Sequence, residues 1–294
     1  MISIIMPVLN GKDLVRYAIS SVICQDYDDW ELVVVDNGST DGSIEVVKRF
    51  TEVDDRISLH VYADRQNMFS AINYGISRAK GEIVGILCHD DMYTPTALSH
   101  VSKFFEEDND LDVVCPRVLV INDYGRKITV ERVIRTDLNF KSILFKPPAE
   151  LARFFRKRLF EVVGPFDDAY KCLAREWLIR ASLKPDVKWV STSHICYIFR
   201  RHAGSMSSAF DKDTRLRYLP EYYLMVKRLL ASGLLNDEQR RLLKHRWLND
   251  SMAGFSLSLR AGRLRDTLFY FVKGTEINYT WPLKLVKRKL LREV

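Results

Sequence analysis

The 294-residue sequence contains no Cys-x-x-Cys pair, no run of 18 uninterrupted apolar residues and no Gly-x-Gly-x-x-Gly motif after its first apolar segment. The missing apolar run argues against a membrane-spanning helix, and the missing glycine motif argues against a Rossmann-type dinucleotide enzyme. Three of the five cysteines, Cys88, Cys115 and Cys196, lie in apolar, strand-like segments. We therefore expect reduced, mostly buried thiols and a cytoplasmic protein.

The chain also lacks internal repeats, low-complexity linkers and a basic segment ahead of its first apolar run. Residues 1–7 therefore predict a first strand and not a signal peptide. Apolar residues make up 47% of the sequence and charged residues 28%, so the composition supports a substantial core and argues against disorder.

Acidic and basic residues are unevenly distributed along the chain. Residues 1–214 contain 28 Lys and Arg against 31 Asp and Glu, a net charge of −3. Residues 215–294 contain 17 against 7, a net charge of +10, so the whole excess of +7 belongs to the C-terminal segment. No nucleic-acid-binding module is recognisable there, so we expect no nucleic-acid partner.

Short apolar runs alternate with segments of helical periodicity through the first half of the chain. The expected strands are Ile2–Val8, Glu31–Val35, Ile57–Val61, Ile83–Leu87 and Asp112–Cys115, with Val118–Ile121 and Ile195–Phe199 further on. The expected helices are 14–23, Ser43–Phe50 (capped by Ser39, Thr40 or Asp41), Phe69–Lys80, Thr94–Phe105 (capped by Thr94), Tyr218–Leu230, Glu238–Ser258 and Thr267–Val272. This alternation predicts an α/β fold whose mostly parallel sheet is covered on both faces.

Carboxylates follow two of these expected strands. Asp36 ends the second strand, and Asp90-Asp91 follows the strand Ile83–Leu87. Ligands of such sheets bind beyond the carboxyl ends of the strands, so these acids are expected at one site. Paired carboxylates suit Mg²⁺ or Mn²⁺ held together with phosphate oxygens. An Asp-Asp pair alone also suits a solvated turn or a helix cap, but its position after a buried strand favours a divalent-metal site.

Four segments as a set are similar to the motifs of inverting glycosyltransferases of family 2, which have the GT-A fold. The segments are Ile5–Asn10, Val33–Ser43, Ala71–Ile76 with Ala79–Glu82, and Ile86–Asp91 with Pro95. The resemblance covers residues 1–116. It implies a GT-A, Rossmann-like mixed sheet, a nucleotide-diphosphate sugar donor, a hydroxyl acceptor and Mn²⁺ or Mg²⁺ as cofactor.

The resemblance also implies roles in donor binding. Pro7 and Asn10 lie around the start of the nucleotide pocket, and Asp36 contacts the base or ribose, although it also suits a simple turn after a strand. Asn73 either contacts the donor or is a helix-surface amide. Arg65 either approaches a phosphate or is a solvated loop arginine.

At the metal site the family pattern implies Asp91 as the direct ligand. It implies that Asp90 contacts either the ribose or the residues that hold the metal. The segment Phe199–Ser207 resembles a later family motif in which a histidine binds the metal or touches the diphosphate. That motif implies His202 at the metal or at the diphosphate, and Arg200 or Arg201 near phosphate.

The expected catalytic base departs from the family pattern. Counting back from Arg180, the usual position of the carboxylate falls on Ala174. Three explanations stay open. Glu176 is the base, a shortened loop brings Asp167 or Asp168 into the role, or catalytic power has been lost. Glu176 is favoured, and its alternative role is a helix N-terminal carboxylate stabilised by the helix dipole.

We therefore expect a glycosyltransferase domain over 1–212, with a nucleotide-sugar half at 1–116 and an acceptor half at 117–212, followed by a basic helical extension at 213–294. The expected reaction transfers a sugar with inversion to a glycan or glycolipid in surface polysaccharide or lipopolysaccharide synthesis. The alternative is a catalytically weak nucleotide-sugar-binding or scaffold protein. Cationic and apolar residues interleave around residues 281–292. This pattern suits either a solvated helix face or an amphipathic helix on the inner face of a membrane, and the membrane surface is the favoured partner.

Overall fold

The computed structural model describes residues 1–62, 67–130, 139–145, 151–170, 174–202 and 212–280. The chain divides into two compact units, Met1–Ala203 and Gly204–Val294. Each unit is described by itself. The sequence placed this division after residue 212.

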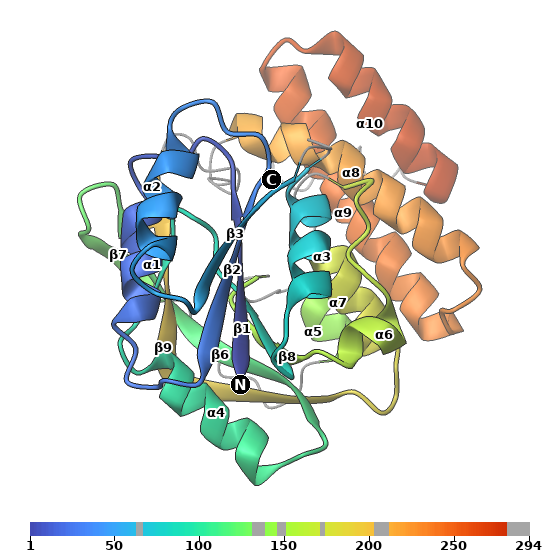
Figure 1. Cartoon of the computed structure of the whole chain (residues 1–294). Coiled ribbons are helices and arrows are strands. Elements are labelled where there is room, and N and C mark those ends of the chain that lie inside the picture. Colours follow the sequence, from blue (N-terminus) through green and yellow to red (C-terminus); the bar gives the residue numbers. More distant parts are fainter. Residues whose placement is uncertain (63–66, 131–138, 146–150, 171–173, 203–211, 281–294) are drawn as a thin grey trace. The chain divides into compact units, whose positions relative to one another are not determined.

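A mixed sheet forms the centre of the first unit, as expected from the sequence (Figure 1). The described residues contain nine strands, β1 (Ile2–Val8), β2 (Trp30–Asp36), β3 (Ile57–Val61), β4 (Ile83–Ile86), β5 (Met92–Tyr93), β6 (Leu111–Asn122), β7 (Lys127–Val130), β8 (Phe154–Arg156) and β9 (Lys188–Arg201). Their spatial order is β3-β2-β1-β4-β8-β6-β9-β5, with β7 beside β6. The strands β3, β2, β1 and β4 are parallel, whereas β8 runs antiparallel to both β4 and β6.

Helices cover both faces of the parallel part. The described helices of the first unit are α1 (Val15–Ile23), α2 (Ser43–Thr51), α3 (Met68–Arg78), α4 (Ala97–Glu107), α5 (Phe140–Phe145), α6 (Leu159–Val163) and α7 (Ala174–Ser182). Alternate residues of β1, from Ile2 to Val8, belong to the core cluster that includes the buried faces of α1 and α4. On the other face α3 approaches β1 so closely that a Cβ on Gly75 would lie 2.5 Å from Ile5 Cγ2. Glycine at this position therefore allows the helix to pack directly on the strand.

Pro7 lies inside a central strand, where proline is normally excluded. Here the ladder to β4 ends at the pair Ile5–Ile86, and the carbonyl of Ile5 accepts the last bond on that side, from Leu87 N–H. Pro7, two residues further, faces the same side beyond the end of β4. Its missing N–H therefore removes no bond from the paired part of this ladder.

Three local expectations were wrong. Asp112–Cys115 and Val118–Ile121 belong to one long strand, β6, because β9 pairs with it along almost its whole length. Helix α4 begins at Ala97 and not at Thr94, since the Thr94 hydroxyl donates to the carbonyl of Ile195 at 2.7 Å and ties this segment to β9. The N-cap of α2 is Gly42, while the carboxylate of Asp41 accepts from the backbone N–H of Ser43.

The described part of the second unit, residues 212–280, forms helices joined by short connections. They are α8 (Lys212–Ala231), α9 (Asp237–Arg260) and α10 (Leu264–Ile277), close to the helical segments expected from the sequence. Asn236 and Gln239 form a capping box that fixes the start of α9. No helix in the described residues is long and apolar enough to cross a membrane.

Candidate functional site

The carboxylate of Asp36 lies at the carboxyl end of β2 and is 1% exposed. Its Oδ1 accepts from the backbone N–H groups of Gly38 and Ser39, both at 2.9 Å. Its Oδ2 is buried and has no partner in the described chain, and the same holds for Oδ1 of the adjacent Asn37. An unsatisfied buried acceptor costs roughly 1–3 kcal/mol, so these two oxygens are suited to a ligand that brings O–H or N–H donors.

Asn10 joins the loop after β1 to the loop after β2. Its Oδ1 accepts from Thr40 N–H at 2.9 Å, and its own N–H donates to Ser39 Oγ at 2.9 Å. Asn10 has φ of 51°, a left-handed conformation that asparagine tolerates better than most residues. Next to it, a Cβ on Gly11 would lie 2.2 Å from the His89 ring, so glycine leaves room for the loop after β4 to pack here.

Asp91 is 2% exposed and both its oxygens are engaged by β9. Oδ2 accepts from the hydroxyl of Tyr197 at 2.7 Å, and Oδ1 accepts from the backbone N–H of Arg200 at 2.8 Å. Burial raises the pKa of Asp91 well above its usual value, and the nearby carboxylate of Asp90 raises it further. The side chain of Arg200 turns to the carbonyl of Asp123 at 3.2 Å.

Asp90 is more accessible and pairs with His202, whose Nε2 lies 2.9 Å from Asp90 Oδ2. The thiol of Cys88 completes a group with Asp90 and Asp91 whose ligand atoms all lie within 4.8 Å of one another. Burial raises the pKa of the Cys88 thiol well above its usual value, and the two carboxylates raise it further. Carboxylate oxygens at this spacing fit a divalent cation such as Mn²⁺ or Mg²⁺. Asp91 is thus held by β9 and Asp90 is the more accessible carboxylate, whereas the family resemblance implies Asp91 as the direct ligand.

Both polar atoms of the Asn73 side chain form hydrogen bonds with the backbone of the turn after α6. Its Nδ2 donates to the carbonyl of Phe166 at 2.8 Å, and its Oδ1 accepts from Phe166 N–H at 3.0 Å. The Phe166 ring stacks on Phe69 of α3 with centroids 5.3 Å apart. Asn73 therefore positions this turn, and we assign it no donor contact.

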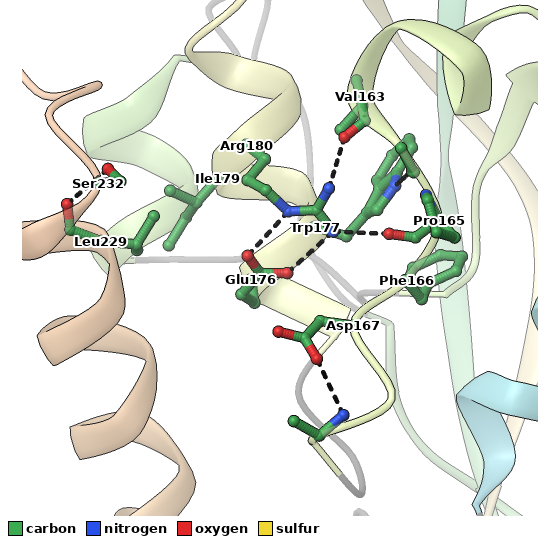
Figure 2. Close-up of polar contacts among 12 residues, drawn as sticks. Val163, Pro165, Phe166, Asp167, Glu176, Trp177, Ile179, Arg180, Leu229 and Ser232 are labelled. Atoms are coloured by element: carbon green, nitrogen blue, oxygen red, sulfur yellow. Dashed lines mark hydrogen bonds and ion pairs between the residues drawn. The ribbon is translucent and has the colours of Figure 1, made fainter.

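The same turn places Asp167 and Asp168 near the start of α3. Asp167 Oδ1 accepts from Ala169 N–H at 2.9 Å (Figure 2). Asp168 is exposed, its carbonyl accepts from the side chain of Asn67, and its Oδ2 lies 3.5 Å from Ser70 Oγ. Since α3 follows β3, its first turn lies at the carboxyl edge of the sheet, where the ligands of such sheets bind.

Glu176 is buried on α7 and forms a two-point ion pair with Arg180 (Figure 2). Oε1 accepts from Arg180 Nε at 2.8 Å, and Oε2 accepts from Nη2 at 3.1 Å. The guanidinium also donates to the carbonyls of Val163 and Pro165, at 2.5 and 2.7 Å. Glu176 thus orients Arg180, which holds the turn after α6. Both carboxylate oxygens of Glu176 accept hydrogen bonds from that arginine.

Sequence reasoning missed two residues that organise the site, Tyr197 and Asn67. Tyr197 lies within an apolar strand, and its partner is remote in sequence. Asn67 caps α3 by accepting from two backbone N–H groups of its first turn, and a signal was available there, since an asparagine directly precedes a helical segment. The predicted contact Arg65 lies outside the described residues.

The family model for glycosyl transferase family 2 matches residues 3–165. The chain belongs to this family. A PGL/p-HBAD biosynthesis glycosyltransferase of Mycobacterium bovis is 30% identical over 253 residues, which cover 84% of this chain and 91% of the relative. An uncharacterised glycosyltransferase of Rickettsia typhi is 35% identical over 114 residues, 39% of this chain and 35% of that protein. The family 2 assignment made from the sequence motifs is therefore confirmed.

Two solved structures share the fold. The mannosyltransferase PcManGT of Pyrobaculum calidifontis, in complex with GDP-Man and Mn²⁺, has a TM-score of 0.63 at 17% identity and covers 100% of this glycosyltransferase and 88% of its own chain. S. aureus TarS 1–349, in complex with UDP-GlcNAc, has a TM-score of 0.61 at 16% identity, covering 94% and 91% of the two chains. Both support the GT-A fold.

Proposed function

We propose that this glycosyltransferase transfers a sugar, with inversion, from a nucleoside diphosphate to a hydroxyl of a membrane-linked glycan or glycolipid. The observation that carries the proposal is the position of Asp36 and Asp90 at the carboxyl ends of β2 and β4, the two neighbours of β1. A nucleoside diphosphate that spans these two carboxylates would place its nucleoside at Asp36 and its diphosphate at Asp90. PcManGT and TarS, whose solved complexes contain GDP-Man and UDP-GlcNAc, support a donor of this class.

The nucleoside end of the donor is assigned to Asp36 and Asn37. Their two buried acceptor oxygens suit ribose hydroxyls or base N–H groups, which would supply the hydrogen bonds that the described residues do not provide. The hydrogen bond between Asn10 and Ser39 holds together the two loops beside these oxygens. Pro7 shapes the strand that leads into it.

The diphosphate end is assigned to Asp90 and His202, with Cys88 and Asp91 beside them. Asp90 would hold the divalent cation, Asp91 would fix the loop through β9, and His202 would orient Asp90 through their 2.9 Å contact. The bound ion would neutralise charge that develops on the leaving diphosphate.

For the catalytic base we propose Asp168. Glu176 is held by Arg180 and Asp167 by its turn, whereas Asp168 is exposed beside the first turn of α3. The acceptor oxygen attacks the anomeric carbon, its proton passes to the carboxylate, and the electrons of the breaking C–O bond leave with the diphosphate. Direct displacement of this kind inverts the anomeric centre.

Calorimetric titration of UDP and GDP tests the donor site, with and without Mn²⁺. We expect Mn²⁺-dependent binding of one nucleotide and its loss in Asp90→Asn. Glu107→Gln, an exposed carboxylate at the end of α4, is the matched control and should bind like the wild type. Mn²⁺-dependent binding of the same strength in Asp90→Asn would remove the metal assignment.

A turnover assay separates the proposed enzyme from a scaffold of the same fold, an alternative motivated by Ala174. Hydrolysis or transfer should fall about 10²–10⁴-fold in Asp168→Asn, while calorimetric donor binding stays unchanged. Donor binding without turnover in the wild type would support the scaffold.

The acceptor assignment draws on the mycobacterial relative, whose name places it in PGL/p-HBAD biosynthesis, and on the basic C-terminal helices. We place the enzyme in surface polysaccharide or glycolipid synthesis on the cytoplasmic face of a membrane. The expected amphipathic segment around residues 281–292 lies outside the described residues. Sedimentation of the full chain with lipid vesicles tests this placement, and a protein that stays in solution would contradict it.

A further inference from the structure

We propose that the exposed face of α10, together with the turn that joins it to α9, is the surface by which this protein contacts an anionic membrane. The proposal deepens the membrane-surface role proposed above and rests on it. All residues of this surface lie in the described part of the chain, and none belongs to residues 281–294.

Apolar side chains line one face of α10. Leu264, Leu268, Phe271 and Val272 are 74%, 63%, 38% and 41% exposed. Their spacing of four, three and one residues places them on the same side of a helix. A different side of α10 is used for packing, since Thr267, Tyr270 and Gly274 are buried. The helix therefore has one packed face and one apolar face that the described residues leave open to solvent.

The turn before α10 extends this face and adds positive charge. Leu259, in the last turn of α9, is 52% exposed. Arg260, Arg263 and Arg265 follow it and are all exposed. The sequence contains no Asp or Glu between Asp250 and Asp266, so this segment carries three cations and two exposed leucines, and the nearest acid is Asp266 in the first turn of α10.

Charge complementarity selects an anionic bilayer as the occupant. Leucines interleaved with arginines suit the boundary between acyl chains and headgroups, where the apolar side chains insert and the guanidinium groups meet phosphates. A second copy of the chain would bring the same three arginines together around a symmetric contact. Like-charge repulsion disfavours that arrangement.

Co-sedimentation of the full-length protein with vesicles tests the surface, with phosphatidylcholine vesicles compared with vesicles that also contain phosphatidylglycerol. Leu268→Ser should weaken binding to the anionic vesicles by about fivefold or more, because an inserted side chain is lost. Leu234→Ser is the matched control, since Leu234 is also 63% exposed but lies in the loop between α8 and α9. It should bind like the wild type.

A second pair of variants tests the charge. Arg263→Gln with Arg265→Gln should reduce the preference for phosphatidylglycerol, and the remaining binding should depend less on salt. Arg241→Gln with Lys244→Gln removes two exposed cations from the first half of α9 and should leave the preference close to that of the wild type.

Equal binding of Leu268→Ser and Leu234→Ser would overturn the proposal. So would a wild type that sediments as a dimer in solution and becomes monomeric only in Leu268→Ser, with vesicle binding unchanged, because the face would then join two copies. Nucleotide titration of the same variants separates this failure from failure of the donor site, which would appear as absent nucleotide binding whatever the vesicles show.

Discussion

The hydroxyl of Tyr197 donates a 2.7 Å hydrogen bond to Oδ2 of Asp91, across 106 residues of sequence. The bond ties the loop after β4 to β9, and the backbone N–H of Arg200 on the same strand satisfies the other oxygen. Asp91 therefore fixes the position of this loop. Its neighbour Asp90 is left as the carboxylate that a ligand can reach.

Replacing Tyr197 by phenylalanine should destabilise the protein by about 1–3 kcal/mol, because a buried carboxylate oxygen loses its partner. Urea unfolding measures this change. The matched control is Tyr93→Phe, since Tyr93 is equally buried in the same aromatic cluster but its hydroxyl donates only a long bond, 3.5 Å, to the carbonyl of Ile86. A loss of stability as large in Tyr93→Phe would show that ring packing, and not the bond to Asp91, matters at Tyr197.

The alternation of strands and helices was predictable from sequence because it depends on local periodicity, and so was the place of Asp36 at the end of β2. The difference in burial and bonding between Asp90 and Asp91 was not predictable. Both follow the same strand, and what distinguishes them is the approach of Tyr197, far away in the chain. Glu176 illustrates the same limit, because the motif marks a carboxylate but does not show that Arg180 holds both its oxygens.

Glu176→Gln should lower stability and leave the base function intact. The substitution keeps the shape of the side chain but removes a charge from a largely buried ion pair, which should cost about 1–3 kcal/mol. Urea unfolding measures that cost, and turnover at saturating donor should fall less than about tenfold. A fall of about 10²–10⁴-fold with unchanged stability would instead identify Glu176 as the base.

Gly75→Ala should destabilise the protein by about 1–3 kcal/mol, because the new methyl group would meet Ile5 Cγ2 at 2.5 Å and Val35 Cγ2 at 3.1 Å. The clash pushes α3 away from β1 and β2. Ser77→Ala, on the exposed face of the same helix, is the control and should change stability by less than about 0.5 kcal/mol. Equal stability of the two variants would mean that α3 can shift without loss of packing.

A stacked pair of histidines should make stability depend on pH. The rings of His100 on α4 and His194 on β9 lie 4.2 Å apart, and His100 Nε2 is 2.7 Å from Thr192 Oγ1. Burial lowers the pKa of His100 below its usual 6.5, and the charges of His194 and Lys103 lower it further. The folded state therefore favours the neutral ring.

Because the unfolded chain binds a proton to His100 at higher pH than the folded chain does, this contribution to stability is complete above pH 6.5. It is lost as the pH falls from there through the lower folded pKa. Melting temperatures measured across this interval should thus fall more steeply for the wild type than for His100→Gln. His245→Gln removes an exposed histidine of α9 and should keep the wild-type slope. If His100→Gln also keeps that slope, the loss of stability in acid must come from other groups.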